Sequence, residues 1–175
     1  MKYEEIIEYI KTQEKELKAN NLEAVYHHIS PRDAVYLTKF FLDNGLDPLK
    51  YLTHIPAQYA YNIKEYYDDK IILPQNIQSI DLWAFGDTFA KELYIPSEVY
   101  YIRKGAFSSK NLKSIYIDGS PVVGEEAFFD CTNVTSIKIN CSKEEWYKHN
   151  HKDINKEDWP LAFTDCINAN LEFLK

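Results

Sequence analysis

Histidine, cysteine and acidic residues of the kind that bind metal ions lie close together in two stretches of the chain. Imidazole nitrogens, thiolates and carboxylates are the usual zinc ligands, so each stretch is a candidate zinc site. Their spacings match no standard set of zinc ligands, however, which predicts surface histidines and neither a metal nor another cofactor. The two groups are Glu23, His27 and His28 in the first stretch, and Cys141, His149, His151 and Asp153 in the second.

Two pairs of adjacent glutamates, Glu125–Glu126 and Glu144–Glu145, could supply the paired carboxylates of a hydrolase. Neighbouring side chains on a strand or a helix point in different directions, so the two acids of a pair do not face one reacting atom. The sequence therefore predicts that both pairs are solvated acidic surface.

Cys131 is a candidate nucleophile, a role that would need an exposed thiol with a base beside it. It closely follows Phe128 and Phe129, and this apolar context predicts a buried structural thiol instead. Cys141 and Cys166 complete neither a disulfide framework nor a CxxC metal pair with it, so three reduced thiols are expected. Because the chain has only five glycines, it also has little material for a phosphate-binding loop, and no catalytic residue is predicted.

The composition is that of a folded chain, with 175 residues of which 45% are hydrophobic and 27% charged. The formal net charge of −7 argues against a basic face that holds nucleic acid. Apolar runs of the length of a signal peptide or a membrane span are absent from the sequence, which predicts a cytoplasmic protein without membrane contact. Abundant Ile, Lys and Asn, together with 14 Tyr, indicate an AT-rich coding sequence and hence a bacterial or phage origin.

The N-terminal region, which ends before Ile71, has the apolar spacing of helices. The best-marked helix runs from Pro31 to Asn44, with Ser30 as its N-cap, Pro31 in its first position and Gly45 after its end. Further helices are expected at residues 2–19 and 22–28, with a short helical turn from Asp47 to about Thr53.

From Ile71 onward the sequence repeats itself at a constant step. Each unit opens with an apolar-x-x-apolar-x-apolar pattern, because Leu112, Ile115 and Ile117 recur as Val134, Ile137 and Ile139. A coil of about 20–29 residues places each short strand beside the next, so that the inward side chains merge into one core. The repeat therefore predicts a solenoid with parallel strands, in which Ile95, Ile117 and Ile139 are buried.

A second feature recurs in step with the strands, namely the pairs Ala84–Phe85, Ala106–Phe107 and Ala127–Phe128. We expect these pairs to fill the opposite wall of the coil, because Ala permits close approach and Phe supplies buried area. The segment "IPAQYAYN", residues 55–62, is a candidate for a degenerate earlier unit with Ala60–Tyr61 in the Ala-Phe position.

The pattern I-x-I-P, V-x-x-I, A-F and C-x-x-L, seen in "LYIPSEVYYIRKGAF" and "VVGEEAFFDCTNVTSI", resembles the BspA-type leucine-rich repeat. The segment "CSKEEWYKH" is similar to the one that often closes such arrays, and the resemblance covers about residues 71–146. The first two units lack the cysteine found at Cys131, and Asp118–Gly119 stands where another unit has Ile-Pro. The resemblance implies a non-enzymatic module that binds another protein.

Beyond the repeats, Ser142 and Glu145 form a capping-box pattern that opens a short helix carrying Trp146 and Tyr147. The ending "LEFLK" is expected to add a last strand, and both terminal segments are expected to cover the ends of the solenoid. The predicted fold class is α+β: a helical N-terminal region packed on a short leucine-rich-repeat solenoid with a parallel β-sheet face and a C-terminal cap. The predicted regions are residues 1–70, 71–146 and 147–175.

A stripe of side chains must point out of the predicted sheet, because side chains alternate across a strand. Its tyrosines are good contact material at protein interfaces, so we expect the stripe to bind the partner. The alternative is that these side chains only pair with one another across the strands. The stripe consists of Ile72, Tyr94, Tyr116 and Lys138.

Two other functions stay open at this point. The acidic chain could be a small phage or mobile-element inhibitor whose carboxylates, such as Glu125 and Glu126, block a nucleic-acid-binding host or defence enzyme. An enzyme with its site in the helical region is the third alternative. None of the three predicts direct contact of this chain with nucleic acid or membrane.

Overall fold

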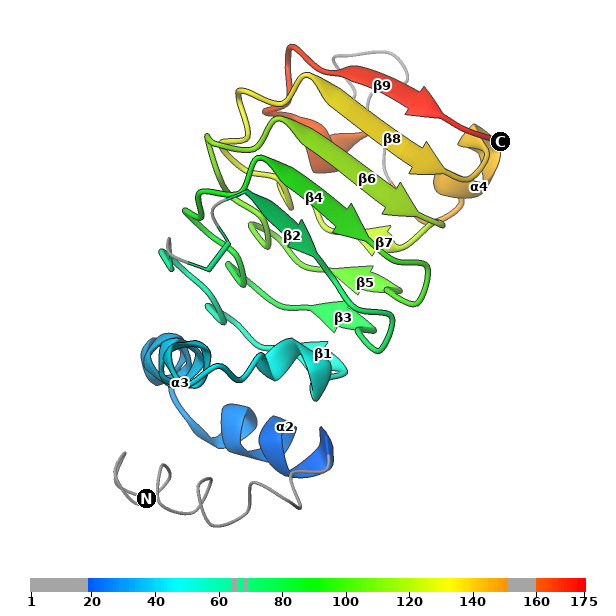
Figure 1. The fold of residues 1–175 in the computed structure, drawn as a ribbon. Helices are drawn as coiled ribbons and strands as arrows, with labels where there is room; N and C mark the ends of the chain where they lie inside the picture. Colours follow the sequence, from blue (N-terminus) through cyan, green and yellow to red (C-terminus); the bar gives the residue numbers. More distant parts are fainter. Residues whose placement is uncertain (1–18, 64–65, 68, 151–159) are drawn as a thin grey trace.

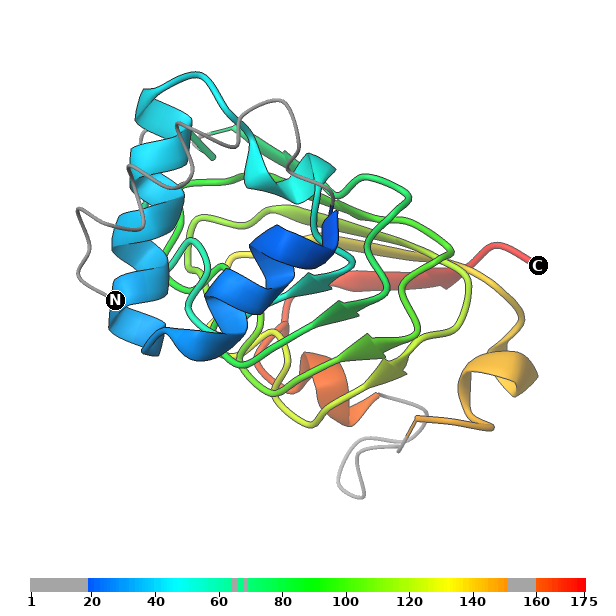
Figure 2. The same cartoon turned by 90° about the horizontal axis from the view of Figure 1, so that it is seen from below.

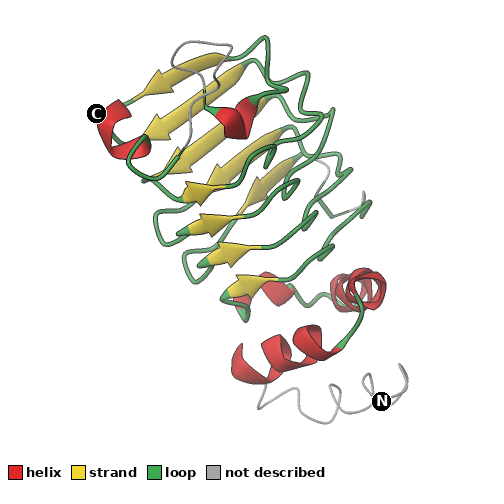
Figure 3. Ribbon diagram, turned by 180° about the vertical axis from the view of Figure 1, so that it is seen from behind, coloured by secondary structure: helices red, strands yellow, loops and turns green. Residues whose placement is uncertain are grey.

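Strands from successive coils pair in parallel and form two sheets, which are two walls of a solenoid (Figure 1). The computed structural model describes residues 19–63, 66–67, 69–150 and 160–175. One wall is a five-stranded sheet of β2 (Lys70–Ile72), β4 (Glu92–Ile95), β6 (Ser114–Asp118), β8 (Ser136–Asn140) and β9 (Asn170–Phe173). The other is a four-stranded sheet of β1 (His54–Ile55), β3 (Ser79–Ile80), β5 (Tyr101–Ile102) and β7 (Val122–Val123), and Figure 3 shows the coil from behind.

The register of the five-stranded sheet follows the repeat in the sequence. Leu93, Ile115 and Ile137 lie side by side at the same constant step. The four-stranded sheet has uneven steps, because the first one, from Ile55 to Ile80, is longer than the repeat. The step that ends at Val123 is one residue shorter than the repeat. The α+β solenoid predicted from the sequence is thus confirmed.

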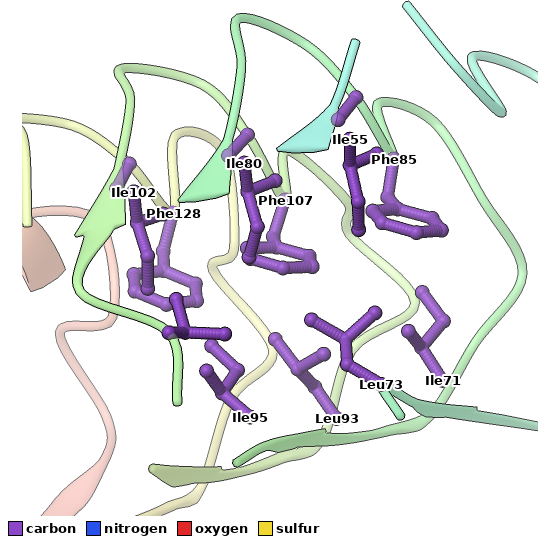
Figure 4. Packing of buried hydrophobic residues seen from close by; sticks show 14 of the residues in the cluster. Ile55, Ile71, Leu73, Ile80, Phe85, Leu93, Ile95, Ile102, Phe107 and Phe128 are labelled. Atoms are coloured by element: carbon purple, nitrogen blue, oxygen red, sulfur yellow. The ribbon is translucent and has the colours of Figure 1, made fainter. Parts of the chain in front are cut away.

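The inward side chains of both sheets meet inside the coil (Figure 4). Ile95, Ile117 and Ile139 are each 0% exposed, which confirms the predicted strand register. Ile80 and Ile102 approach them from the four-stranded sheet, as Figure 4 shows for the first coils. Burying such aliphatic side chains stabilises the fold by about 1.5–3 kcal/mol each.

The predicted Ala-Phe pairs are buried and build a ladder of stacked rings along the third side of the coil. Phe85 and Phe107 have ring centroids 5.5 Å apart, and Phe107 and Phe128 follow at 5.6 Å. Phe163 continues the ladder at 4.8 Å from Phe128, so the stack leads from the repeats into the C-terminal segment. Stacked aromatic pairs add about 0.5–1.5 kcal/mol to the area that they bury.

The predicted placement of Ala60–Tyr61 in this ladder is wrong by one residue. The N–H of Ala60 donates to the carbonyl of Ala84, as the N–H of Phe85 donates to that of Ala106, so Ala60 occupies the place of Phe. Tyr59 is the buried ring beside Phe85, at 5.7 Å, whereas Tyr61 is exposed. The cause is the longer first step of the four-stranded sheet.

The N-terminal elements cover the first coil (Figure 2). They are α2 (Ala19–His28), α3 (Pro31–Asp43) and the 3-10 helix η1 (Pro48–Lys50). Ser30 caps α3 as predicted, because its hydroxyl accepts from the N–H of Asp33 at 3.2 Å. Leu22 of α2 and Leu37 of α3 belong to the same buried cluster as the repeats. The helix predicted for residues 2–19 lies outside the described residues, apart from Ala19, where α2 begins.

The C-terminal segment closes the other end with α4 (Lys143–Trp146) and η2 (Leu161–Phe163). Ser142 caps α4 as predicted, accepting from the N–H of Glu145 at 3.1 Å. The side chain of Asn150 accepts from the N–H of Val123 at 2.7 Å and donates to the carbonyl of Pro121 at 2.9 Å. It thereby satisfies backbone groups of β7, which is the last strand of its sheet. The predicted last strand is β9.

Candidate functional site

The four residues predicted to form the stripe lie in register on adjacent strands of the five-stranded sheet. Ile72 pairs with Tyr94, Tyr94 with Tyr116, and Tyr116 with Lys138. Ile72 is 65% exposed and Tyr94 37%, whereas Tyr116 is half-buried and Lys138 exposed. We call these four side chains the tyrosine stripe.

The two tyrosines in the middle of the stripe stack on each other. Their ring centroids are 5.1 Å apart and their planes differ by 6°. Partial burial raises the pKa of the Tyr116 hydroxyl, and the charge of Asp118 and the neighbouring Tyr94 raise it further, so this hydroxyl is neutral at physiological pH. Each ring restricts the other, and the pair presents a fixed apolar surface with two hydroxyl groups.

A shallow hollow of about 560 Å³ lies along the stripe. Ser114 and Ser136 contribute to its lining, next to Tyr94 and Tyr116, because each serine precedes an inward residue and points to the same side as the tyrosines. The short serine side chains beside the long tyrosines account for the hollow. Its polar lining consists of serine and tyrosine hydroxyls, the ion pair of Lys70 with Glu92, and the positive charge of Lys138.

The stripe extends further than the sequence analysis predicted. Glu172 of β9 lies in register beside Lys138 and is exposed, so it forms the next member of the row. The alternation of apolar and polar residues in "LEFLK" indicated that Glu172 points outward. The repeat did not indicate which residue it lies beside, because the step from Ile137 to Leu171 is much longer than the repeat. Among the described residues, Lys138 has no ion-pair partner.

The alternative acidic surface, Glu125 and Glu126, follows β7 of the four-stranded sheet. The carboxylate of Glu126 forms an ion pair with Lys104 at 2.6 Å, and this hydrogen bond raises the pKa of the Lys104 ammonium. Glu125 is exposed. One of the two charges is therefore balanced within the chain, which leaves a weaker acidic patch than the sequence suggests.

Of the three residues of the first candidate zinc site, Glu23 makes a structural contact. The carboxylate of Glu23 accepts hydrogen bonds from Thr53 and from the N–H of His54, the latter at 2.8 Å. Burial raises the pKa of Glu23, but the hydrogen bonds from Thr53 and His54 outweigh it, so that the pKa is lowered overall. Glu23 thus ties α2 to β1. His27 and His28 are exposed at the end of α2.

The second candidate zinc site is not assembled by the described residues. Cys141 is buried and His149 exposed, while His151 and Asp153 lie outside the described residues. Within residues 19–63, 66–67, 69–150 and 160–175, no group of three or more His, Cys, Asp or Glu side chains is placed to hold a metal ion. Glu144 and Glu145 are exposed in α4.

Cys131 is 0% exposed, as predicted, and so cannot meet a substrate without opening the coil. Its thiol donates to the carbonyl of Phe107 at 3.0 Å, and burial raises its pKa to about 12. Cys141 and Cys166 are also free and buried. The thiol of Cys131 is therefore part of the core.

A second hollow, of about 750 Å³, lies between α2 and the four-stranded sheet. Its charged groups already have partners, since Glu23 binds Thr53 and His54 and the guanidinium of Arg103 lies 3.4 Å from Asp81. The sequence analysis missed this hollow, because segments remote in the sequence form it.

Residues 53–156 match the BspA type leucine rich repeat region, in six copies, which confirms the resemblance seen in the sequence. The match includes β1 and thus begins before Ile71, where the regular repeat becomes visible in the sequence. Comparison with curated proteins and with solved structures gives no match. None of the helices in the described part of the chain has the length and apolar character needed to cross a bilayer.

Proposed function

Because the chain belongs to the BspA-type leucine-rich-repeat family, we propose that it is a non-enzymatic module that binds another protein through the tyrosine stripe. The observation that carries the proposal is the exposed stack of Tyr94 on Tyr116 in the middle of the five-stranded sheet. Its edges are Ile72 on one side and Lys138 on the other.

The stack suits a binding surface for an energetic reason. A tyrosine offers a large apolar ring and a hydroxyl while losing little conformational freedom on binding. Since Tyr94 and Tyr116 already restrict each other, a partner that covers them orders fewer side chains at the moment of association. The hollow beside them can receive a small side chain of the partner, and Lys138 favours an acidic group there.

The acidic-inhibitor alternative relies on the net charge of −7 and on carboxylates such as Glu125 and Glu126. The ion pair between Glu126 and Lys104 counts against this patch, because a partner would have to displace or tolerate the lysine. Among the residues that the structure describes, the one charged member of the tyrosine stripe, Lys138, forms no ion pair. We therefore propose the stripe as the binding surface and keep the acidic patch as its competitor in the test.

The test compares variants of the two surfaces against a partner captured by the wild-type chain. Tyr94→Ala with Tyr116→Ala should weaken binding by about 2 kcal/mol or more if these residues are hot spots. Tyr100→Ala is the matched control, because Tyr100 is 56% exposed and lies outside the stripe. Glu125→Lys with Glu126→Lys, titrated at low and high salt, tests the acidic patch. Loss of binding in that variant alone would reject the stripe.

A further inference from the structure

β2 is an edge strand of the five-stranded sheet, and no described strand pairs with its outer side. The N–H of Leu73 donates to the carbonyl of Tyr94 at 3.1 Å, so Leu73 faces β4. Backbone groups alternate in direction along a strand, and the N–H and C=O groups of Lys70 and Ile72 therefore face away from β4. No backbone hydrogen bond from a described turn or loop reaches these groups.

The first coil explains why this edge is open. Each later coil up to β7 supplies one strand to each sheet, but the segment before β1 carries the 3-10 helix η1, Pro48–Lys50, instead of a strand. A 3-10 helix presents no row of backbone groups at strand spacing. As a result, no described backbone group bonds to the outward N–H and C=O groups of Lys70 and Ile72.

The side chains of this edge protect it from pairing only in part. Open edges are normally protected by charges, proline or a covering segment. Ile72 is 65% exposed, the highest value among the large apolar side chains of the described residues. Lys70 is ion-paired with Glu92 at 2.8 Å, so its charge is partly balanced. Pro74 has no N–H, which ends the edge after Ile72 and limits pairing to a short stretch.

We propose that β2 is an acceptor edge, to which an extended segment of the partner protein adds as a sixth strand of the five-stranded sheet. The proposal deepens the proposed function and rests on it, since it takes the bound molecule to be a protein. An added strand satisfies the outward N–H and C=O groups of Lys70 and Ile72, which a globular contact cannot do along a whole edge. It also continues the row of the tyrosine stripe beyond Ile72.

The same observations define the chemistry of the added segment. We expect its residue beside Ile72 to be apolar. The exposed side chain of Ile72 then makes an apolar contact when the added strand removes it from water. Its residue beside Lys70 is acidic, as Glu92 is on the opposite side of Lys70. A second copy of this chain is the less suitable occupant, because two chains of net charge −7 repel each other.

The first experiment needs no partner and uses the intact chain. Amide hydrogen exchange, followed by nuclear magnetic resonance, should show faster exchange for Lys70 and Ile72 than for Leu73, which is bonded to Tyr94. Slow exchange of the Ile72 amide in the free chain would show that its N–H already has a partner and would overturn the proposal.

The second experiment selects binders from a library of short random peptides on the intact chain. Selected peptides should slow the exchange of the Ile72 amide and lose at least about tenfold in affinity for Ile72→Pro, which lacks the outward N–H. Ile72→Val is the control, because it keeps the N–H, the β-branching and the apolar contact, so that only Ile72→Pro removes the N–H. N-methylation of every second peptide residue should abolish binding when the methylated residues are those whose N–H groups face β2, and should have little effect when the other set is methylated. This comparison tests strand pairing without changing the protein.

The outcomes separate this inference from the proposed function. Peptides that bind Ile72→Pro normally but not Tyr94→Ala with Tyr116→Ala would overturn the acceptor edge and leave the stripe standing. Peptides that lose binding to Ile72→Pro but not to the tyrosine variant support the edge and count against the stripe. Selection of no peptide, or of peptides unaffected by either variant, overturns the acceptor edge.

Discussion

Phe128, the last ring of the repeated Ala-Phe pairs, stacks on Phe163 of the C-terminal segment, with their ring centroids 4.8 Å apart and their planes differing by 25°. Trp146 of α4 lies on Phe163 in turn, at 6.0 Å. Both Phe128 and Phe163 are 0% exposed. The segment after the repeats is therefore joined to the array by the same ring ladder that joins the repeats to one another.

Phe163→Ala should destabilise the whole chain, because it leaves a cavity at the end of the ladder and uncovers Phe128. We expect a loss of about 3–5 kcal/mol in the free energy of unfolding, measured by urea denaturation. Phe129→Ala is the matched control, since Phe129 is 41% exposed and should cost much less. Equal stability of the two variants would contradict the role of Phe163 in closing the solenoid.

Ile117 and Tyr116 are neighbours in β6 that point to opposite faces, so their alanine variants should differ in kind. Ile117→Ala should cost about 2–5 kcal/mol of stability by leaving a cavity. Tyr116→Ala leaves no cavity in the core and should cost less, because it loses the stack with Tyr94, worth about 0.5–1.5 kcal/mol, and the partial burial of one ring. Denaturant unfolding with both variants checks the register, which is wrong if the order of the two losses is reversed.

The thiol of Cys131 should resist alkylation in the folded chain and react after unfolding, because it is buried and its pKa is raised from 9.0 to about 12. In the unfolded chain the thiol ionises near its ordinary pKa, while in the folded chain it stays neutral. The contribution of the neutral Cys131 thiol to the free energy of unfolding is therefore fully present below pH 9.0 and is lost as the pH rises toward about 12.

Cys131→Ala removes this contribution but keeps all the tyrosines, whose ionisation also affects stability at high pH. A comparison of wild type with this variant therefore isolates the effect of the thiol. The difference in unfolding free energy between wild type and variant should shrink as the pH rises above 9.0. Rapid labelling of Cys131 in the native chain, resolved by peptide mass spectrometry, is the result that would contradict its burial.

Glu23→Gln should loosen the contact between α2 and β1, because the charged carboxylate accepts the hydrogen bonds from Thr53 and His54. The pKa of Glu23 is lowered overall, so its contribution is present above the ordinary value of 4.5 and is lost as the pH falls through the folded value. We expect a loss of about 1 kcal/mol at neutral pH that fades in acid. Glu144→Gln, at an exposed site, is the control and should cost much less stability at neutral pH.

The five-stranded sheet could be predicted because each of its strands must bury apolar side chains, and these residues recur in the sequence at a constant interval. Ile95, Ile117 and Ile139 must each fill the same place in the coil, so the same residue type recurs at the same step. The outward positions of Tyr94 and Tyr116 then follow from the alternation of a strand. Their mutual stacking does not follow, because it depends on side-chain rotamers.

The first coil and the last strand were harder to place, because their steps differ from the repeat. Because of the longer step before the second coil, Tyr59 and not the expected Tyr61 is the buried ring beside Phe85. The long excursion before β9 hid the position of Glu172 beside Lys138. The hollow under α2 depends on how a helix packs on strands far away in the chain, which periodicity does not report.

The short step of the four-stranded sheet that ends at Val123 is compensated in the stretch that follows it. The stretch from Ile115 to Val123 is one residue shorter than its equivalent in the coil before. The return from Val123 to Ile137 is one residue longer than the return before it. The stretch after β7 therefore has one residue more, which makes up for the residue missing before β7, and the chain returns to the five-stranded sheet in register. The solenoid therefore tolerates an inserted or deleted residue around the four-stranded sheet, while the residues of the tyrosine stripe keep their constant spacing in the five-stranded sheet.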